Sequence, residues 1–403
     1  MLSVAEARER ICAAFSTLPA EQVALPDALG RVLAEDVHAR LDQPPFTASA
    51  MDGYAVRSLD VSTVPARLKV VGQAPAGGAY AGQLGPGEAV RIFTGGPLPR
   101  GADAVVIQED TERIGDEVVI KETAAPGHYV RPAGLDFKQG ERGLAAGKRL
   151  NPRDIGLAAA MNHPWLRVRR RPRIAILATG DEIVMPGDPV GPQQIVSSNG
   201  LALAAFVRAA GATPVDLGIA PDHREALQRL AAGAAGADLL LTSGGASVGD
   251  HDLVRAALGE EGMEVDFWKV AMRPGKPLMF GHAGPTPVLG LPGNPVSTLV
   301  CATVFLRPAL RIMLGETTMA KETERALAGR DLPQNDSRQD YLRAKLSWNA
   351  AGDRVATPFD RQDSSMLFLL QQADCLIVRP PHAPAISAGG ELAIVRLDGF
   401  GDA

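Results

Sequence analysis

The spacing of apolar and polar positions divides the chain into regions of different character. Residues 1–40 place apolar side chains about 3.6 residues apart, interrupted at Gly30, which predicts a helix, a loop and a second helix. From Pro44 to Gly140 the pattern changes to short β-like runs such as "RLKVVG", "EAVRIF" and "DAVVIQED", separated by Gly and Pro. These 97 residues are therefore predicted to form a small β-rich unit inserted between two helical segments.

The helical pattern returns over residues 141–172, where "LNPRDIGLAAA" gives a clear helix start. Asn151 is expected to cap this helix and Pro152 to occupy its first position, because proline there loses no intrahelical hydrogen bond. The basic run "RVRRRPR" that follows is interpreted as a solvated strand edge and linker rather than a phosphate-backbone site.

From Arg173 onward, strand-like and helix-like patterns alternate. The runs "RIAILAT", "TPVDLGI" and "DLLLTSGG" are mostly apolar without strict alternation, while "SNGLALAAFVRAAG" and "DHREALQRLAAGA" are amphipathic. Such strands predict a mostly parallel sheet that helices cover on both faces. Beyond about residue 320, "RQDYLRAKLSW", "CLIVRPP" and "ELAIVRL" predict the strands of a further small β domain.

Composition supports a multidomain globular protein: the chain has 403 residues, of which 46% are hydrophobic and 22% charged. The N-terminus lacks the features of a signal peptide, and no run of apolar residues is long enough to predict a membrane span. Three scattered cysteines predict no disulfide framework, so a reducing, cytoplasmic setting is expected. A net charge of −5 argues against a general nucleic-acid binder.

Polar or glycine-rich turns follow four of the predicted parallel strands: "ATGDE", "GIAPD", "TSGGASVGD" and "LPGNPVS". Because ligands bind at the carboxyl ends of parallel strands, these turns are expected to converge on one site. In the third turn, glycines would let backbone amides approach an anion, and serines would add hydroxyl donors. The residues concerned are Ser243, Gly244, Gly245, Ser247 and Gly249. For any single turn, a tight reversal of the chain is an equally good interpretation.

Acidic residues near the same edge would repel a bound phosphate unless a cation were present. The candidates are Asp181, Glu182, Asp222, Asp250 and Asp252, and Mg²⁺ suits scattered single carboxylates because it retains water and binds ligand phosphates as well. For Asp222, a role as a helix cap is an alternative of nearly equal weight.

A cationic segment, "FWKVAMRPGKPLMFG", follows, with Lys269, Arg273 and Lys276 close together in a chain otherwise poor in lysine. We interpret it as a cationic surface beside the acidic site, although a solvated charged strand is the alternative. In "LPGNPVS", Asn294 is expected to cap a helix whose first residue is Pro295, giving a rigid helix start open to a second anion.

The sequence contains no zinc-type Cys/His spacing, nucleophile elbow or P-loop. What remains is metal-assisted handling of a phosphorylated ligand. Asp52 and Thr94, in the inserted unit, would be assigned to hairpin turns by composition alone.

Six phrases together resemble the molybdopterin molybdenumtransferase family (MoeA-like proteins, related to the E domain of gephyrin): "SAMDGYAV", "TGGPLPRGADAVV", "LATGDEI", "TSGGASVGDHD", "FWKVAMRPGKP" and "GLPGNPVS". The likeness runs in order from about residue 5 to residue 397. It implies a multidomain α/β plus β fold, with a central three-layer α/β domain (173–320), an inserted β-rich domain (44–140), a helical linker domain (1–43 and 141–172) and a C-terminal β barrel (321–403).

The resemblance also implies an activity: insertion of molybdenum from molybdate into adenylylated molybdopterin with release of AMP, assisted by Mg²⁺. A separate molybdopterin adenylyltransferase would supply the substrate, and a homodimer would form the active site across subunits. The positions carried over by motif are Asp52, Thr94, Asp136 in "GLDFKQG", Glu182, Asp222, Asp252, Lys269, Pro292 and Pro295, and Arg343 in "YLRAKL" and Ser365 in "QDSSML" resemble positions near the family's molybdate site. Further candidates are Arg273 for catalysis and Lys276, Gly293, Asn294 and Ser297 for binding the substrate.

One residue departs from the family pattern: "KPGKP" is "RPGKP" here, so that Arg273 replaces a lysine and brings a wider, forked cation. Two other functions remain open from the residues. Adenylyl transfer from ATP to molybdopterin would suit the α/β unit, and a receptor-anchoring scaffold would bind peptide without turnover.

Overall fold

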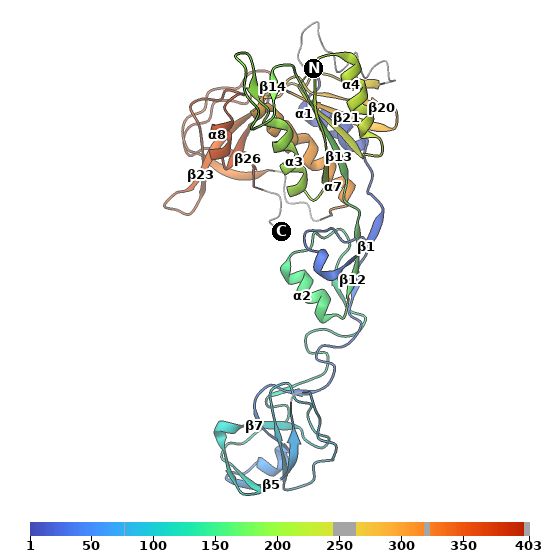
Figure 1. The fold of residues 1–403 in the computed structure, drawn as a ribbon. Helices are drawn as coiled ribbons and strands as arrows, with labels where there is room; N and C mark the ends of the chain where they lie inside the picture. The colour runs from blue at the N-terminus through green and yellow to red at the C-terminus, as the bar shows by residue number, and fades with distance from the viewer. Residues whose placement is uncertain (76, 245–262, 318–322, 399–403) are drawn as a thin grey trace.

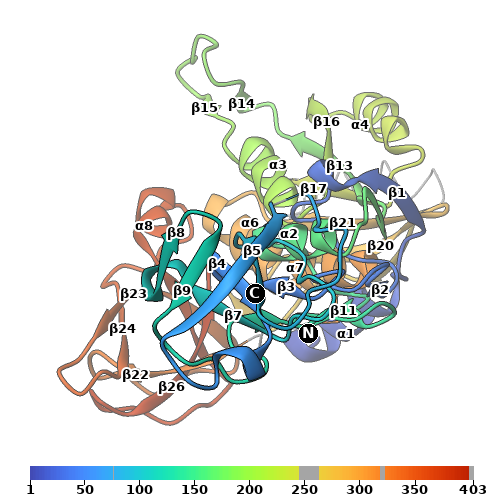
Figure 2. The ribbon, with the colours of Figure 1, turned by 90° about the horizontal axis from the view of Figure 1, so that it is seen from below.

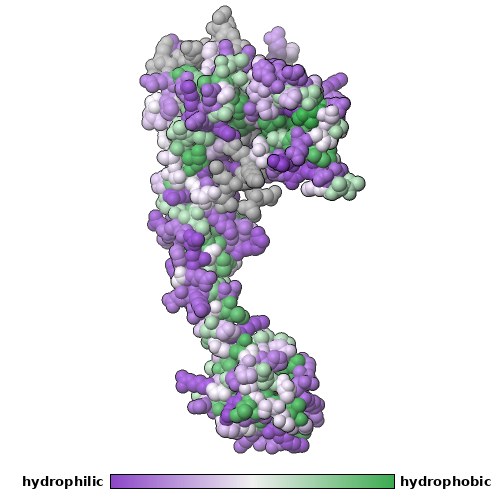
Figure 3. Space-filling model, turned by 180° about the vertical axis from the view of Figure 1, so that it is seen from behind, coloured by the Kyte–Doolittle hydropathy of each residue, from purple (hydrophilic) through white to green (hydrophobic). Residues whose placement is uncertain are grey.

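The computed structural model describes residues 1–75, 77–244, 263–317 and 323–398. The molecule is elongated, with a two-part body at one end, a narrow stem, and a separate β unit at the other end (Figure 1). Seen from behind, hydrophilic residues cover much of the stem (Figure 3). The predicted multidomain α/β plus β architecture is confirmed.

The central unit is a six-stranded sheet in the described part of the chain, and four of its strands run parallel. In spatial order the strands are β16 (Thr213–Ala220), β13 (Arg173–Thr179), β17 (Leu239–Ser243), β21 (Thr286–Leu291), β20 (Met279–Ala283) and β18 (Met263–Phe267). The first four pair in parallel, and β20 and β18 continue the sheet antiparallel. Side chains of β13 and β17 are buried throughout, apart from exposed Arg173, as expected for strands covered on both faces.

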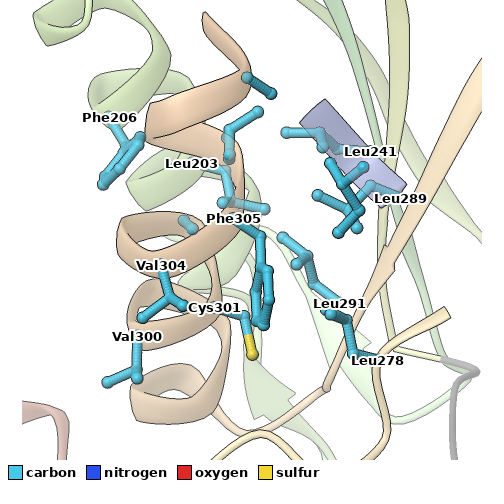
Figure 4. Close-up of a cluster of buried hydrophobic side chains, with 14 of the residues drawn as sticks. Leu203, Phe206, Leu241, Leu278, Leu289, Leu291, Val300, Cys301, Val304 and Phe305 are labelled. Carbon is cyan, nitrogen blue, oxygen red and sulfur yellow. The ribbon is translucent and has the colours of Figure 1, made fainter. Parts of the chain in front are cut away.

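Helices cover both faces of this sheet, which gives the three layers expected. The helical elements are α3 (Asn199–Ala209), α4 (Arg224–Ala231) with a 3₁₀ turn (Ala232–Ala234), and a continuous helix made of α6 (Pro295–Cys301), a π-helical turn (Ala302–Leu306) and α7 (Arg307–Leu314). On one face, side chains of the long helix and α3 pack against Leu241, Leu289 and Leu291 of the sheet (Figure 4). On the other face α4 covers a smaller core.

The long helix Pro295–Leu314 has the length and apolar character of a membrane span, but 72% of its most apolar window is buried inside the fold. Its apolar side chains form the central core, which accounts for that character without a membrane.

The N-terminal helix α1 (Val4–Ala13) belongs to this central core rather than to the stem. Val4, Ala7 and Ile11 are buried in the same cluster as α7, and the Thr17 hydroxyl donates to the Ile312 carbonyl. Ser3 and Glu6 form a reciprocal capping box at the start of α1.

The stem contains only part of the helix predicted for it. The predicted second helix within residues 1–40 is wrong: Ala20–Ala24 is a strand, β1, paired antiparallel with β12 (Trp165–Arg169), and a single 3₁₀ turn (Leu25–Asp27) follows. A cross-strand partner some 140 residues away overrides the local periodicity. The helix at 151 is confirmed as α2 (Pro152–Ala160), with Asn151 as its N-cap and Pro152 at its first position. Strands β2 (Val37–His38) and β11 (Arg142–Leu144) complete the stem.

The inserted unit is a six-stranded sheet within its described residues, with a second small strand pair. The order is β7 (Ala104–Ile107), β4 (Gly53–Val56), β6 (Glu88–Ile92), β5 (Ala66–Ala74), β9 (Glu117–Ile120) and β8 (Thr111–Ile114); the pair is β3 (Ala48–Ser49) with β10 (Val130–Arg131). Two 3₁₀ turns, Ser58–Val61 and Gln108–Asp110, connect its strands.

The C-terminal unit is a closed five-stranded barrel. Its strands are β23 (Gln339–Trp348), β24 (Arg354–Pro358), β22 (Glu324–Ala328), β26 (Glu391–Arg396) and β25 (Cys375–Arg379), and β25 returns to pair with β23. One helix, α8 (Leu367–Gln372), lies on its outside, and β19 (Met272–Arg273) of the central chain segment adds to β23. The central unit and the barrel are thus joined by backbone pairing.

Candidate functional site

A pocket of about 780 Å³ opens where the carboxyl ends of the parallel strands meet the barrel. Strands β13, β17 and β21 end at this edge in the turns that the sequence singles out. Lining residues from the central unit include Thr179, Gly180, Glu182, Asn199, Asp222, Ser243, Gly244, Lys276, Pro292, Gly293, Asn294, Pro295 and Ser297. The predicted convergence of the strand ends is therefore seen, although three of the proposed turns contribute more than the one at Asp222.

Backbone segments approach one another closely at the floor of the pocket. Gly244 has φ +97, and a Cβ there would lie 2.5 Å from the Thr179 carbonyl oxygen. A Cβ at Gly293 would lie 3.6 Å from the Cα of Gly244. Only glycine fits at 244, and its absent side chain leaves the backbone open toward the pocket.

Asn199, at the start of α3, ties these turns together. Its Nδ2 donates to the Ser243 Oγ at 2.9 Å and to the Gly293 carbonyl at 2.6 Å. Ser243 itself is buried. Sequence analysis did not single out Asn199, whose local pattern marks only a helix start. The remaining members of the predicted glycine turn, Gly245, Ser247, Gly249 and Asp252, lie outside the described residues.

The long helix begins as expected, with Asn294 as N-cap and Pro295 at the first position. The Asn294 side chain makes no capping bond, and its Nδ2 donates instead to the Ser364 Oγ of the barrel at 2.8 Å. The Thr298 hydroxyl donates to the Pro292 carbonyl at 2.6 Å and closes the first turn. The helix start is therefore bound to the barrel as well as to the sheet.

Glu182 and Asp222 line the pocket and stand near a third carboxyl group, that of Asp181. Burial, followed by repulsion from Asp181 and Glu182, raises the pKa of Asp222 above its usual range. The N-cap of α4 is His223, whose Nδ1 accepts from the Ala226 amide, so Asp222 is not the helix cap. Within the described ranges, no group of three or more His, Cys, Asp or Glu side chains is arranged to hold a metal ion.

Of the three predicted cations, only Lys276 lines the pocket. Lys269 stacks on the Trp268 ring, with its Nζ 5.0 Å from the ring centroid. Arg273 turns toward the barrel: its Nε donates to Asp340 Oδ1 at 2.9 Å, its Nη2 donates to Asp340 Oδ2, and its Nη1 lies 3.2 Å from Asp336 Oδ2. The Asp340 hydrogen bonds raise the pKa of the Arg273 guanidinium.

The barrel closes the pocket with Arg338, Ser364, Ser365 and Leu367. Arg343, which the sequence proposed for this role, is fully buried beneath the pocket wall, where its Nη2 donates to the Asp363 carbonyl at 3.1 Å. Burial lowers the pKa of Arg343. Arg338, five residues earlier, is the arginine of the barrel that lines the pocket.

The inserted unit lies at the opposite end of the molecule from this pocket (Figure 1). It carries Asp52 and Thr94, next to the paired strands β4 and β6, and Asp136 lies between β10 of this unit and β11 of the stem. Asp52 Oδ1 accepts from both the amide and the hydroxyl of Thr94, at 2.6 and 2.7 Å. These two hydrogen bonds hold the pKa of Asp52 below its usual range. The Asp136 amide donates to the Gln43 carbonyl at 2.9 Å. Asp52 and Thr94 form one built cluster, but it does not meet the pocket of its own chain.

Comparison with known proteins matches three domain models in order along the chain. They are the MoeA N-terminal region (domains I and II) over residues 2–162, the probable molybdopterin-binding domain over 175–312, and the MoeA C-terminal region (domain IV) over 325–397. The fold and the pocket thus define a class: multidomain proteins built around a molybdopterin-binding α/β domain.

Relatives narrow this class. A molybdopterin molybdenumtransferase of a Nostoc species is 39% identical over 94% of this chain and 88% of its own length. Molybdopterin molybdenumtransferase 2 of Mycobacterium tuberculosis is 38% identical over 93% and 94%. The crystal structure of a molybdopterin biosynthesis MoeA protein from Pyrococcus horikoshii has a TM-score of 0.85 and 32% identity, covering 99% of this chain and 100% of its own. The chain belongs to the molybdopterin molybdenumtransferase family.

Proposed function

We propose that the pocket binds adenylylated molybdopterin together with molybdate and exchanges the adenylate for molybdenum, releasing AMP. The observation that carries this proposal is the set of groups that line one cavity. Serine hydroxyls and backbone turns lie there together with two cations, Lys276 and Arg338, and two carboxylates, Glu182 and Asp222. The names of the relatives, which match along nearly the whole chain, support the same transfer reaction in molybdenum cofactor biosynthesis.

The phosphoryl end of the ligand would bind the turn at Gly244 and the helix start at Pro295. Hydrogen bonds from backbone amides and serine hydroxyls to charged oxygens contribute about 1.5–3 kcal/mol each. Glycine at 244 lets the ligand reach the backbone, and Ser243 and Ser297 add hydroxyl groups from below. Neutral donors of this kind hold a phosphate in a fixed orientation.

Molybdate would bind on the opposite wall, where Lys276 and Arg338 contribute positive charge and Ser364 and Ser365 contribute hydroxyls. A dianion there would stand beside the pterin dithiolene when the phosphate occupies the glycine turn. These side chains would orient the oxyanion while two Mo–S bonds form to the dithiolene and one molybdate oxygen leaves as water, taking the two thiol protons.

The two carboxylates of the pocket lining would suit a magnesium ion that keeps most of its water. The raised pKa of Asp222 arises partly from repulsion by Asp181 and Glu182, which a bound cation would relieve. Glu182 and Asp222 would hold the ion, with Asp252 as a further proposed ligand outside the described residues. When bound, Mg²⁺ would neutralise charge on the phosphoryl oxygens.

We further propose a homodimer in which the inserted unit of one chain reaches the pocket of the other. The inserted unit lies at the far end of the molecule from its own pocket (Figure 1), so a second copy would be needed to bring its Asp52–Thr94 cluster to a substrate. The arm that carries β14 (Ile183–Val184) and β15 (Ile195–Val196) projects from the body (Figure 2) and exposes Ile195 and Val196. Such an arm would suit a contact between copies.

A separate molybdopterin adenylyltransferase would supply the substrate, in the cytoplasm. The cytoplasmic setting is supported by Cys12, Cys301 and Cys375, which form no disulfide.

The test is AMP release from adenylylated molybdopterin under anaerobic conditions with Mg²⁺, with and without molybdate. We expect molybdate to accelerate release and a molybdenum-bound pterin to form. Pyrophosphate formation from ATP and molybdopterin would point to adenylyl transfer instead. Substrate binding with no molybdate-dependent release would refute the transferase proposal.

A further inference from the structure

Arg273 occupies an unusual place, between two cavities. The turn that follows it, Pro274 to Lys276, lines the large pocket, whereas Arg273 itself lines a smaller cavity of about 350 Å³ at the mouth of the barrel. Its guanidinium therefore faces away from the pocket that Lys276 enters. Because the guanidinium of Arg273 faces the smaller cavity, it is not placed to hold a ligand in the large pocket directly.

The contacts of Arg273 join the central unit to the barrel. Arg273 and Asp340 are directly paired in the parallel bridge between β19 and β23, and the Gln339 amide donates to the Ala271 carbonyl at 2.9 Å. Nε and Nη2 of Arg273 make a two-pronged contact with the Asp340 carboxylate, which is itself buried. A planar guanidinium suits this fork, whereas a lysine would make a single contact.

Asp336 connects Arg273 to Arg338, which lines the large pocket. Its carboxylate lies 3.2 Å from Arg273 Nη1 and 3.3 Å from Nη2 of Arg338, the pocket-lining cation of the barrel. Its second oxygen accepts from the Arg338 amide at 2.8 Å. One arginine outside the pocket thus touches the carboxylate that orients a cation inside it.

The backbone between Arg273 and Lys276 is also held in place, by hydrogen bonds and by close packing. The Lys276 carbonyl accepts from the amides of Val270 and Leu278, both at 3.1 Å. Gly275 has φ +108, and a Cβ there would lie 2.5 Å from the Cys301 Sγ, so the turn is packed tightly against the long helix. Fixing Arg273 at one end of this turn therefore fixes where Lys276 stands.

We propose that Arg273 is a positioning residue that clamps the barrel to the central unit through Asp340 and Asp336, and so sets the spacing of Lys276 and Arg338 for an oxyanion. The identity of the anion as molybdate rests on the proposed function, whereas the clamp rests on the contacts of Arg273 alone. Arg273 makes no contact with the anion.

The test compares Arg273→Met, Asp340→Asn and the double variant. Molybdate affinity is measured by titration calorimetry, and molybdate KM and kcat by AMP release. If the two residues act as one clamp, each single variant weakens molybdate binding by about tenfold, and the double variant is no worse than either one. KM should rise with little change in kcat, because the spacing of the cations is disturbed and the phosphoryl end is not.

The matched control is Asp360→Asn. Asp360 pairs with Arg330 at the same barrel mouth but does not touch the turn, so its loss should leave affinity unchanged. Arg273→Lys should recover part of the lost affinity through a single contact with Asp340. If Asp340→Asn retains affinity while Arg273→Met loses it, or if the two losses multiply, Arg273 contacts the anion itself and the proposal is overturned.

Hydrogen exchange separates this proposal from the proposed function. Arg273→Met and Asp340→Asn should both accelerate exchange of the Gln339 amide and of the turn at 270–276, and Asp360→Asn should not. This holds with or without molybdate. If exchange is unchanged in the variants, the clamp is overturned even when the enzyme is active. If exchange is accelerated in the variants but the wild type shows no molybdate-dependent AMP release, only the proposed function is overturned.

Discussion

Replacing Gly244 by alanine tests whether backbone approach at the pocket floor is a real constraint. The φ of +97 at this position costs an L-residue about 1–2 kcal/mol. The added Cβ would also lie 2.5 Å from the Thr179 carbonyl oxygen, which is backbone and cannot rotate away. Overpacking of this kind adds about 1–3 kcal/mol. We therefore expect a total loss of about 2–5 kcal/mol, because β13 and β17 must separate to make room.

Alanine substitutions at two other glycines distinguish the cost of the positive φ from the cost of the close approach. Gly218 has φ +82 with nothing within 4 Å of a Cβ, so Gly218→Ala should show the backbone cost alone. Gly293 has no positive φ, and its Cβ would meet Gly244 at an ordinary 3.6 Å, so Gly293→Ala should be nearly neutral. At roughly 2–4 °C per kcal/mol, scanning calorimetry should resolve the three in that order. Equal shifts for Gly244→Ala and Gly218→Ala would refute the argument from close approach.

Three further perturbations follow from the charged groups. Asp222→Asn should stabilise the metal-free protein at neutral pH. The pKa of Asp222 in the folded protein is raised above 3.8, so the free energy of unfolding of the wild type falls as the pH rises from 3.8 through the raised pKa. Below pH 3.8 the wild type and the variant should not differ in this contribution. Thermal melts in EDTA across the acid range measure this, and a pH-independent difference would contradict it. Lys276→Met should weaken molybdate binding by about tenfold or more in calorimetry, while Lys345→Met, outside the pocket, should not. Arg149→Met should destabilise the junction of stem and body by about 2 kcal/mol in urea titrations, since Arg149 donates to the Gly30 and Ala210 carbonyls and pairs with Glu316; unchanged stability would show that the junction does not depend on it.

Local patterns predicted the parts of the site that depend on neighbouring residues. The turn at Gly244 and the helix start at Asn294 and Pro295 were readable because strand ends, caps and helix-initiating prolines have short-range signatures. Asn294 still differs in detail, because its side chain bonds Ser364, a residue 70 positions away that no local pattern could supply.

The errors arose where a distant segment decides. The strand at Ala20–Ala24 forms because β12 pairs with it, and Arg273 faces outward because Asp340 lies opposite. Arg338 directly precedes β23 and Arg343 lies within it, and the closure of the barrel determines which of the two lines the pocket. Proximity of Asp52 to Thr94 likewise depends on the pairing of β4 with β6.

The position of α1 in the central core has a consequence for synthesis. Val4, Ala7 and Ile11 pack against α7, and the Thr17 hydroxyl reaches a carbonyl 295 residues later. At about 5–20 residues per second, a ribosome would need roughly 15–60 s to deliver that partner. During this time the inserted unit and the stem can fold, but the apolar face of α1 has nothing to cover it. The capping box of Ser3 and Glu6 is local, so it can stabilise α1 from the start. The apolar face of α1 is thus exposed until the central unit that buries it has been made.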